Sequence, residues 1–343
     1  MLRTFIYILV FPLDLLSLVF GICIYRLTKK TPYLSYKSMH RLFYIFGGIV
    51  TEFIHNSTKS KKRNILNYNH KENNEIIKNI NEDGLFIQEN FLTSYEVEQI
   101  KKMISNYEFT LRTMDGEVKK NLTKSDTYKF DPKNPKAVMY SVDSNFLINQ
   151  KIIQQILLKN EIFDIGLKYF GTEPLLDHVS LSISTNFKKE PDKEAAQLYH
   201  FDLDKPKWLK FLTYVNDVGI DNGPHCFIKK THKNNAIPFS LRSKGYIRID
   251  DQNNNLKNMI NNEIKITGKA GTSIIEDTKG LHKGLVVKSG YRILLNIQIN
   301  SSMFGSPSKK VNFNKIDKDL LEKFIEKKDF FSQSTNLISF LNR

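Results

Sequence analysis

From residue 175 onward the sequence is divided into short segments rich in β-branched and aromatic residues, and this feature limits the possible folds most strongly. Turn-forming residues, such as "DNGP" at 221–224, separate the segments. Short runs of this composition between turn signals are typical of β-strands. The pattern predicts an all-β core with flanking helices, and strands at 85–88, 175–187, 195–203, 208–216, 272–277 and 291–299.

Helical patterns precede most of these strands. Residues 94–106 are predicted to form a helix, because Thr93 and Glu96 have the spacing of a capping box. Residues 145–170 also have helical periodicity and stop at Gly171, a residue type that favours a helix C-terminus. Helices followed by many short strands indicate a β core that is buttressed by helices.

The N-terminal stretch "FIYILVFPLDLLSLVFGICIY", residues 5–25, is long enough and apolar enough to span a bilayer. Pro12 and Asp14 interrupt it, and a carboxylate at membrane depth is costly. The basic residues that follow would keep the rest of the chain cytoplasmic by the positive-inside rule: Arg26, Lys29, Lys30 and Lys37.

We therefore expect residues 1–55 to associate with a membrane, as one spanning or re-entrant helix and an interfacial segment near 42–50. The alternative is a hydrophobic helix that packs on the rest of the chain or forms an oligomer contact. Residues 56–75 are polar and are predicted to form a linker, so residues 76–343 would form one domain. The expected localisation is at a membrane, with the domain over residues 76–343 in the cytoplasm.

The net charge of +15 suits an anionic partner, such as an acidic substrate or a membrane surface. No basic patch interleaved with aromatic residues points to nucleic acid, so no nucleic-acid partner is expected. The two cysteines, Cys23 and Cys226, provide neither a disulfide framework nor zinc-ligand spacing.

The candidate chemistry lies in four residues from two segments. His200 and Asp202 are two apart in a predicted strand, so their side chains would share one face. His282 follows at a predicted turn, and Arg292 lies on the strand after it. Two histidines and one carboxylate that leave open metal positions form the arrangement used by non-haem Fe(II) oxygenases. An arginine beside that site suits a dicarboxylate co-substrate, because a guanidinium binds a carboxylate through two hydrogen bonds.

The blocks "AAQLYHFD", "KFLTYVNDVGIDNGPHCFIKKTHK" and "GTSIIEDTKGLHKG", followed by Arg292, resemble the phytanoyl-CoA dioxygenase-like family of Fe(II)/2-oxoglutarate-dependent oxygenases. The resemblance covers roughly residues 80 to 300 and implies a double-stranded β-helix, a jelly-roll barrel of the cupin type. It implies that His200, Asp202 and His282 ligate iron and that Arg292 binds the distal carboxylate of 2-oxoglutarate. The sequence "KKTHK" stands where this family usually has Gly-Ser-His, which leaves the substrate open.

The evidence that other residues near these motifs bind a ligand or the metal is weaker. Thr272 and Asn296 are candidates for hydrogen bonds to 2-oxoglutarate, although a buried polar network explains Asn296 and Gln298 equally well. Asp277 is expected to cap a turn rather than to ligate metal. Residues expected in loops near the barrel mouth, where they would contact substrate or lie in solvent, are His225, His232, Arg242 and Arg248. Trp208 and Tyr214 are expected in the core, and 250–262 as a surface loop or lid.

The leading hypothesis is a dioxygenase that hydroxylates an organic substrate, such as a lipid or another anionic molecule, with O2 and with conversion of 2-oxoglutarate to succinate. Two alternatives remain open at this point. One is a non-catalytic jelly-roll binding module, and the other is a cupin-like metalloenzyme that does not use 2-oxoglutarate.

Overall fold

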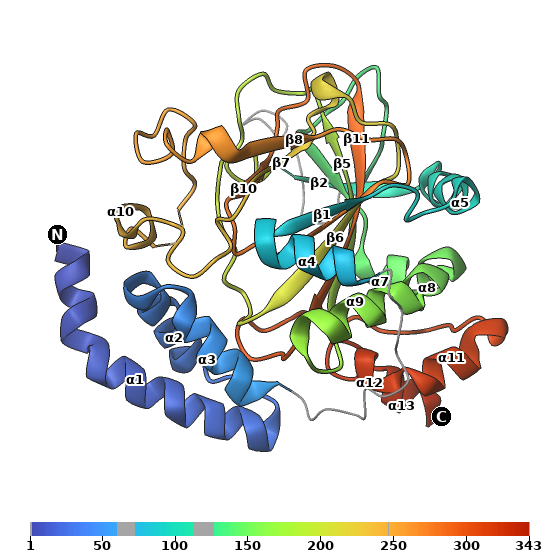
Figure 1. Cartoon of the computed structure of the whole chain (residues 1–343). Coiled ribbons are helices and arrows are strands. Elements are labelled where there is room, and N and C mark those ends of the chain that lie inside the picture. Colours follow the sequence, from blue (N-terminus) through green and yellow to red (C-terminus); the bar gives the residue numbers. More distant parts are fainter. Residues whose placement is uncertain (1, 60–72, 113–126, 246, 343) are drawn as a thin grey trace.

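The strands of the protein form two antiparallel sheets. This computed structural model describes residues 2–59, 73–112, 127–245 and 247–342. The large sheet has the strand order β1-β9-β6-β11-β5-β4-β2-β3, and the small sheet has the order β10-β7-β8 (Figure 1). The strands are β1 (Leu85–Gln88), β2 (Glu108–Arg112), β3 (Thr127–Lys129), β4 (Met139–Ser141), β5 (Leu175–Thr185), β6 (Trp208–Tyr214), β7 (His225–Ile228), β8 (Glu263–Ile266), β9 (Ser273–Glu276), β10 (His282–Gly284) and β11 (Tyr291–Asn300).

The two sheets pack face to face into a jelly-roll barrel, and the alternation of side chains along each strand divides inside from outside. On β11, Ile293, Leu295 and Ile297 join the hydrophobic core outside the barrel, whereas Leu294 joins the cluster between the sheets. The inner cluster takes side chains from β1, β6 and β9 of the large sheet and from β7 and β8 of the small one. Even-numbered residues of β6 and β11 therefore face the barrel interior.

Helices cover the outer face of the large sheet (Figure 1). Helix α9 ends at Gly171, which adopts a left-handed conformation with φ of 63° as the C-cap. The capping box of Thr93 and Glu96 begins α5, as the sequence predicts. The helices in this part of the chain are α4 (Asn73–Asp83), α5 (Ser94–Ile104), α7 (Ser144–Ile148), α8 (Lys151–Leu157), α9 (Asn160–Phe170), α10 (Phe239–Arg242), α11 (Leu321–Glu326), α12 (Lys328–Phe331) and α13 (Leu337–Leu341).

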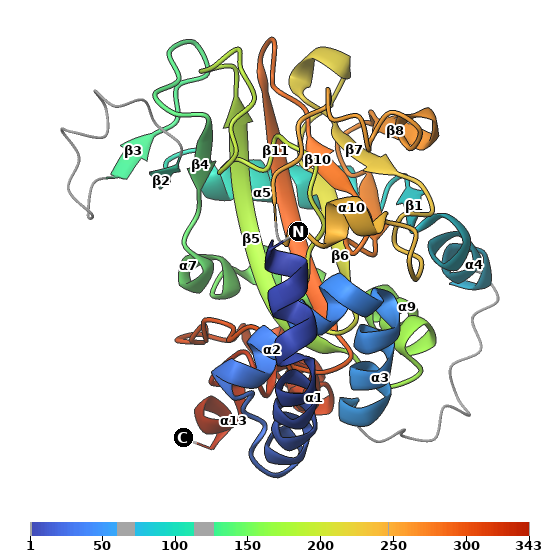
Figure 2. The same cartoon turned by 90° about the vertical axis from the view of Figure 1, so that its left-hand side faces the viewer.

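Three helices precede this body and pack against it: α1 (Leu2–Thr28), α2 (Tyr33–Phe46) and α3 (Gly48–Thr58). Helix α1 is the outermost, with α2 and α3 between it and the barrel (Figures 1 and 2). The Tyr25 hydroxyl of α1 accepts a hydrogen bond from the backbone N–H of Met303, and His55 of α3 is 2.8 Å from the Ser301 hydroxyl. The N-terminal region is thus attached to the end of β11.

Asp14, which interrupts the apolar stretch, is buried between α1 and α2. Arg41 donates to its Oδ2 over 2.8 Å and also to its Oδ1, and Ser38 donates to Oδ1 over 2.9 Å. One helix is long and apolar enough to be a candidate membrane span by length and composition, over Leu9–Thr28, and 28% of that stretch is buried. The packing agrees with the alternative in which the apolar helix lies on the domain, although most of α1 is not covered.

Arg242 fastens α2 to the segment that follows β7. Its buried guanidinium donates to the carbonyls of Tyr44, Ile45 and Ile237 at 3.0–3.1 Å. Tyr44 and Ile45 lie in the last turn of α2, where carbonyl groups lack partners within the helix. The prediction that Arg242 contacts substrate or lies in solvent is therefore wrong, because its donors are used by the α2 C-terminus and by Ile237.

Several predicted boundaries differ from the structure. Residues 195–203 do not form a strand; only Tyr199 and His200 make isolated bridges there. The predicted helical region 145–170 is divided into α7, α8 and α9. The predicted linker 56–75 overlaps the end of α3 and the start of α4, and its residues 60–72 lie outside the described residues.

We expect Arg242→Ala to lower the free energy of unfolding by about 2–3 kcal/mol, because buried backbone acceptors lose a charged donor. Urea denaturation measures this loss. Arg26→Ala is the matched control, since the exposed Arg26 makes a single bond, to the Ser57 carbonyl, and its loss should cost less than about 0.5 kcal/mol. Equal losses in the two variants would contradict this role of Arg242.

Stability is also expected to fall in mild acid because of His55. Burial, together with the charges of Lys207, Lys59 and Lys279, lowers the pKa of His55 from 6.5 to about 3. Between these two values the unfolded chain binds a proton that the folded chain does not, so stability decreases as pH falls below 6.5. His55→Gln should reduce the slope between pH 6 and pH 4 by about 1.4 kcal/mol per pH unit in urea titrations. An unchanged slope would show that His55 is protonated in the folded protein.

Candidate metal centre

His200 and His282 are brought together by backbone pairing across the barrel. The N–H of each donates to the carbonyl of the other, over 3.1 and 2.9 Å. The two imidazole rings lie 4.2 Å apart between centroids, and both residues are 5% exposed. His282 begins β10 rather than lying in a turn, which corrects the sequence prediction.

The same local contact orients both rings. Nδ1 of His200 lies 2.9 Å from the Leu198 carbonyl, and Nδ1 of His282 lies 2.9 Å from the Gly280 carbonyl. A carbonyl only accepts, so each Nδ1 carries the hydrogen and each Nε2 has a free lone pair. This is the tautomer in which histidine binds a metal through Nε2.

Asp202 completes a cluster of three buried ligand groups. Its carboxylate oxygens are 3.9 Å from Nε2 of His200 and 3.6 Å from Nε2 of His282. The backbone N–H of Asp202 donates to the Thr278 carbonyl over 2.8 Å, which fixes the chain on this side of the cluster. The potential ligand atoms of the three residues all lie within 4.8 Å of one another.

Lys210 supports the carboxylate. It projects inward from β6, and its Nζ donates to Asp202 Oδ2 over 2.6 Å. Burial alone would raise the pKa of Asp202, but the charge of Lys210, with contributions from the two histidines, outweighs burial and lowers it. Burial lowers the pKa of His200 and of His282, so both imidazoles stay neutral near pH 7.

These three groups fit a divalent transition metal. They offer two neutral imidazole nitrogens and one carboxylate oxygen, a donor set that suits iron and related ions. Ligands bonded at about 2.1 Å around such an ion lie about 3 Å apart, so the donor atoms need to close by roughly 1 Å. Three protein ligands on one side leave the other coordination positions for small molecules.

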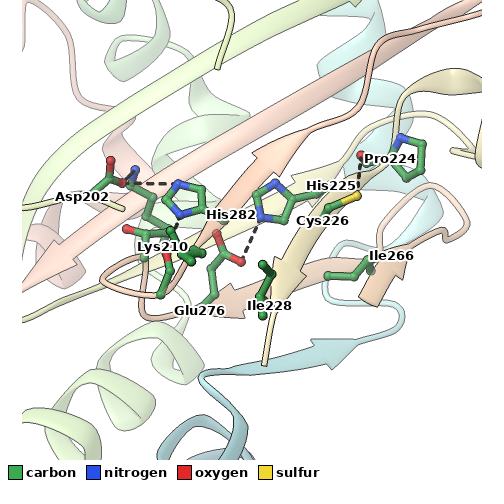
Figure 3. Close-up of polar contacts among 12 residues, drawn as sticks. Asp202, Lys210, Pro224, His225, Cys226, Ile228, Ile266, Glu276 and His282 are labelled. Carbon is green, nitrogen blue, oxygen red and sulfur yellow. Dashed lines mark hydrogen bonds and ion pairs between the residues drawn. The ribbon is translucent and has the colours of Figure 1, made fainter. Parts of the chain in front are cut away.

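A second buried pair lies beside the cluster. His225 of β7 and Glu276 of β9 are joined at 3.0 Å between Nε2 and Oε2, and Glu276 is fully buried. In Figure 3, His282 lies between Asp202 and His225; its ring is 5.8 Å from that of His225. The expectation that His225 is a loop residue is wrong, because it occupies an inward position in a strand.

Arg292 projects from β11 into the same interior. Its guanidinium donates to the Gly223 carbonyl and, over 3.3 Å, to the Ser184 hydroxyl. Its Nε has no hydrogen-bond partner, and no ion pair within 4.0 Å joins Arg292 to an acidic group among the described residues. Burial lowers its pKa, but a guanidinium stays charged in proteins. A buried charge without a counter-ion is costly, so this arrangement favours an anionic ligand.

The position of Gly284 relates Arg292 to the cluster. A Cβ on Gly284 would lie 2.8 Å from Nη2 of Arg292, so the absent side chain makes room for the guanidinium. His282 and Gly284 are two apart on β10 and face the same way, about 7 Å apart along the strand. The distance between the guanidinium and the candidate metal position is therefore roughly the length of a small dicarboxylate.

The other predicted cofactor residues fall in two places. Asn296 shares the inward face of β11 with Arg292, as the period of two predicts, and its Nδ2 is 3.5 Å from the Ser180 hydroxyl. Its Oδ1 is buried without a partner. Thr272 lies in the turn before β9 and packs against Gly268. The roles of both in binding 2-oxoglutarate remain predictions.

Asp277 is a turn residue, as expected. Its carboxylate accepts from the Tyr169 hydroxyl over 2.6 Å and from the Lys279 backbone over 3.0 Å. The core positions of Trp208 and Tyr214 are also confirmed, since both are fully buried. Residues 250–262 lie outside the two sheets and contain a short 3-10 helix, Ile260–Asn262.

No protein-family model and no curated protein matches the sequence. Among solved structures, EctD from S. alaskensis with bound Fe is 14% identical, with 73% of this chain and 84% of that chain covered and a TM-score of 0.47. The non-heme alpha ketoglutarate dependent epimerase SnoN from nogalamycin biosynthesis is 13% identical, with 66% and 82% covered and a TM-score of 0.46. HygX from Streptomyces hygroscopicus, with nickel, 2-oxoglutarate and hygromycin B bound, is 11% identical, with 72% and 93% covered and a TM-score of 0.43. These similarities are remote.

Two parts of the interior were missed by sequence reasoning, Lys210 and the pair of His225 with Glu276. Lys210 carried a usable signal, since it interrupts the otherwise apolar run "WLKFL" at an inward position. Glu276 carried a weaker one, in the segment "SIIE". Neither signal identifies a partner, because Asp202 lies in an irregular segment eight residues before Lys210 and His225 lies on a strand 51 residues before Glu276.

We expect the protein to bind one divalent transition-metal ion, and His282→Gln or Asp202→Asn to weaken that binding on the order of 100-fold or more, because each removes a ligand. Calorimetric titration with Co(II) or Fe(II) under anaerobic conditions measures it. The matched control is His225→Gln, an equally buried histidine that can still donate to Glu276. A similar loss in all three variants would mean that the cluster is not the metal site.

Proposed function

We propose that the protein is an Fe(II)/2-oxoglutarate-dependent oxygenase that hydroxylates an organic substrate, with His200, Asp202 and His282 as the iron ligands. The observation that carries the proposal is Arg292, a buried guanidinium that lies near the metal cluster and has no acidic partner among the described residues. A metal site with a cation at this distance suits a co-substrate that has a chelating end and a second carboxylate.

The charges of the interior support this co-substrate. The Lys210 ammonium pairs with the Asp202 carboxylate at 2.6 Å, whereas Arg292 has no acidic group within 4.0 Å among the described residues. A divalent metal ion would add two positive charges beside Arg292 in a region of low dielectric. The dianion 2-oxoglutarate brings two negative charges, which offset those of the metal.

In this proposal, each protein group has a separate task. The carbonyls of Leu198 and Gly280 hold the two imidazoles in the metal-binding tautomer, and Lys210 holds Asp202 ionised and oriented. Arg292 fixes the far carboxylate of 2-oxoglutarate, and the two sheets exclude water. Iron with 2-oxoglutarate and O2 supplies the oxidation, in which R–H becomes R–OH while 2-oxoglutarate loses CO2 and becomes succinate.

The resemblance of the three sequence blocks supports the proposal that the protein is a phytanoyl-CoA dioxygenase-like enzyme. The substrate class we propose is a lipid or another anionic organic molecule, which is favoured by the net charge of +15. A cytoplasmic catalytic domain agrees with the supply of Fe(II) and 2-oxoglutarate.

The deciding experiment compares Arg292→Ala with wild type. We expect iron-loaded wild-type protein to bind 2-oxoglutarate and release succinate slowly even without substrate. Arg292→Ala should weaken 2-oxoglutarate binding about 100-fold, roughly 3 kcal/mol, because a charged pair of hydrogen bonds is lost. Calorimetry gives the binding constant, and chromatography of the acids gives the succinate.

Arg242→Ala is the control, since it removes another buried guanidinium that lies outside the barrel interior. It should lose stability but keep 2-oxoglutarate binding. Succinate release that does not depend on Arg292 would contradict the assignment of this residue. If the protein binds iron but releases no succinate, a non-catalytic binding module is favoured. If a metal-dependent activity does not change when 2-oxoglutarate is added, a cupin-like metalloenzyme is favoured.

A further inference from the structure

Helix α1 has one covered face and one bare face, although nearly all of its residues are apolar. The covered face includes Asp14, Leu18, Ile22 and Tyr25 and packs on α2, α3 and the end of β11. The bare face carries five large side chains that are 63–86% exposed, which we call the α1 stripe: Leu9, Leu13, Leu16, Phe20 and Leu27. At 3.6 residues per turn these five fall within an arc of about 60°.

The exposed apolar surface extends onto the next two helices. Phe46 at the end of α2 packs against Phe11 of α1 and is 41% exposed. Tyr33, Leu34, Ile49 and Phe53 are also exposed. A continuous surface of this kind is uncommon on a protein that stays in water and marks an interaction site.

Positive charge accompanies the α1 stripe. Exposed basic side chains lie at the end of α1 and in the first turns of α2: Arg26, Lys29, Lys30 and Lys37. Asp14 is the only acidic residue among the first 50, and it is buried in its contacts with Arg41 and Ser38. The surface around the α1 stripe therefore presents cations with no exposed acid among residues 9–50. The next acid in the sequence, the exposed Glu52 of α3, accepts a hydrogen bond from Asn234.

We propose that the α1 stripe docks the protein on an anionic phospholipid bilayer, with α1 lying in the plane of the membrane interface rather than crossing it. An apolar helix face flanked by lysine and arginine has the chemistry of an interfacial helix. The inference does not depend on the proposed oxygenase activity.

The packing of α1 argues against a spanning helix. α1 contacts α2 from Tyr7, whose ring packs on Tyr44, to Ser17, which is hydrogen-bonded with Ser35. If α1 crossed the bilayer with these contacts intact, Lys37 and Arg41 of α2 would be carried to membrane depth. If the contacts broke, Asp14 would enter the hydrocarbon core without Arg41, which is strongly unfavourable. Lying flat keeps the Asp14–Arg41 pair on the protein side.

The charge also selects lipid over a second copy of the chain. A symmetric dimer through the α1 stripe would bring together two surfaces that carry the same four cations. Like charges across an interface oppose association, whereas an anionic bilayer attracts them.

Docking would orient the rest of the molecule because α2 is fixed to the barrel. Arg242 connects the last turn of α2 to the segment after β7, and that segment continues to Ile249, which pairs with Tyr199 beside His200. Docking of α1 would therefore set the position of the metal cluster relative to the membrane surface.

The test uses the full chain and vesicles of phosphatidylcholine alone or with phosphatidylserine. We expect flotation with the anionic vesicles, weakened by salt because surface charges are screened. The variant Leu13→Gln, Leu16→Gln, Phe20→Gln should lower the partition coefficient at least about tenfold. Exposed side chains are changed, so folding should be unaffected, and circular dichroism checks this. The matched control changes three exposed apolar residues outside α1–α3: Tyr95→Gln, Ile220→Gln and Ile325→Gln.

Label depth separates a flat helix from a spanning one. Cys226 is buried and Cys23 is exposed, so in a Cys23→Ser background a single spin label can be placed by Leu9→Cys, Leu16→Cys or Leu27→Cys. These positions cover about 27 Å of helix. A flat helix gives three equal, shallow depths, whereas a spanning helix gives a deep label at 16 and shallow labels at the ends.

Three outcomes would overturn the proposal. The first is no flotation with anionic vesicles, and the second is a depth profile of the spanning kind. The third is equal flotation of the stripe variant and the control, combined with a stripe-dependent dimer in sedimentation without lipid.

Discussion

The candidate site depends on one pair of backbone hydrogen bonds. By exchanging N–H and carbonyl contacts, His200 and His282 place two imidazoles side by side although 81 residues separate them in the chain. Each ring then uses the carbonyl two residues before it to set its tautomer. The metal-binding geometry is therefore built mainly from main-chain contacts, which leaves the surrounding side chains free to set the charge and shape of the interior.

The barrel interior holds charged and polar side chains beside its small apolar cluster, and the sheets show why this is possible. Apart from Thr213, the alternate residues of β6 and β11 that face the helical layer are apolar or aromatic, so that side supplies most of the hydrophobic core. The inward side can then carry Lys210, Arg292 and Asn296 without loss of that core. Lys210 and Asp202 neutralise each other and His225 contacts Glu276, whereas Arg292 is left for an external anion.

The N-terminal helices show how an apolar sequence can belong to a domain and still expose a surface. The Asp14 contacts with Arg41 and Ser38 satisfy the one carboxylate in α1 and hold this helix against α2. Arg242, His55 and Tyr25 then hold the helices on the barrel. Because these polar contacts all lie on the inner side, the outer side of α1 is left with the apolar groups of the α1 stripe.

The sequence by itself determined the strand-rich core, the helix start at Thr93, the helix end at Gly171 and the ligand candidates His200, Asp202, His282 and Arg292. These follow from local rules: strand period, capping geometry and the chemical types that a metal and a dicarboxylate require. Only the tertiary structure decided that Lys210 holds Asp202, that His225 pairs with Glu276 inside the barrel, and which face of α1 is bare. The physical reason is that strand order, register and helix packing bring together groups from distant segments, and no local pattern records which side chain will be the partner.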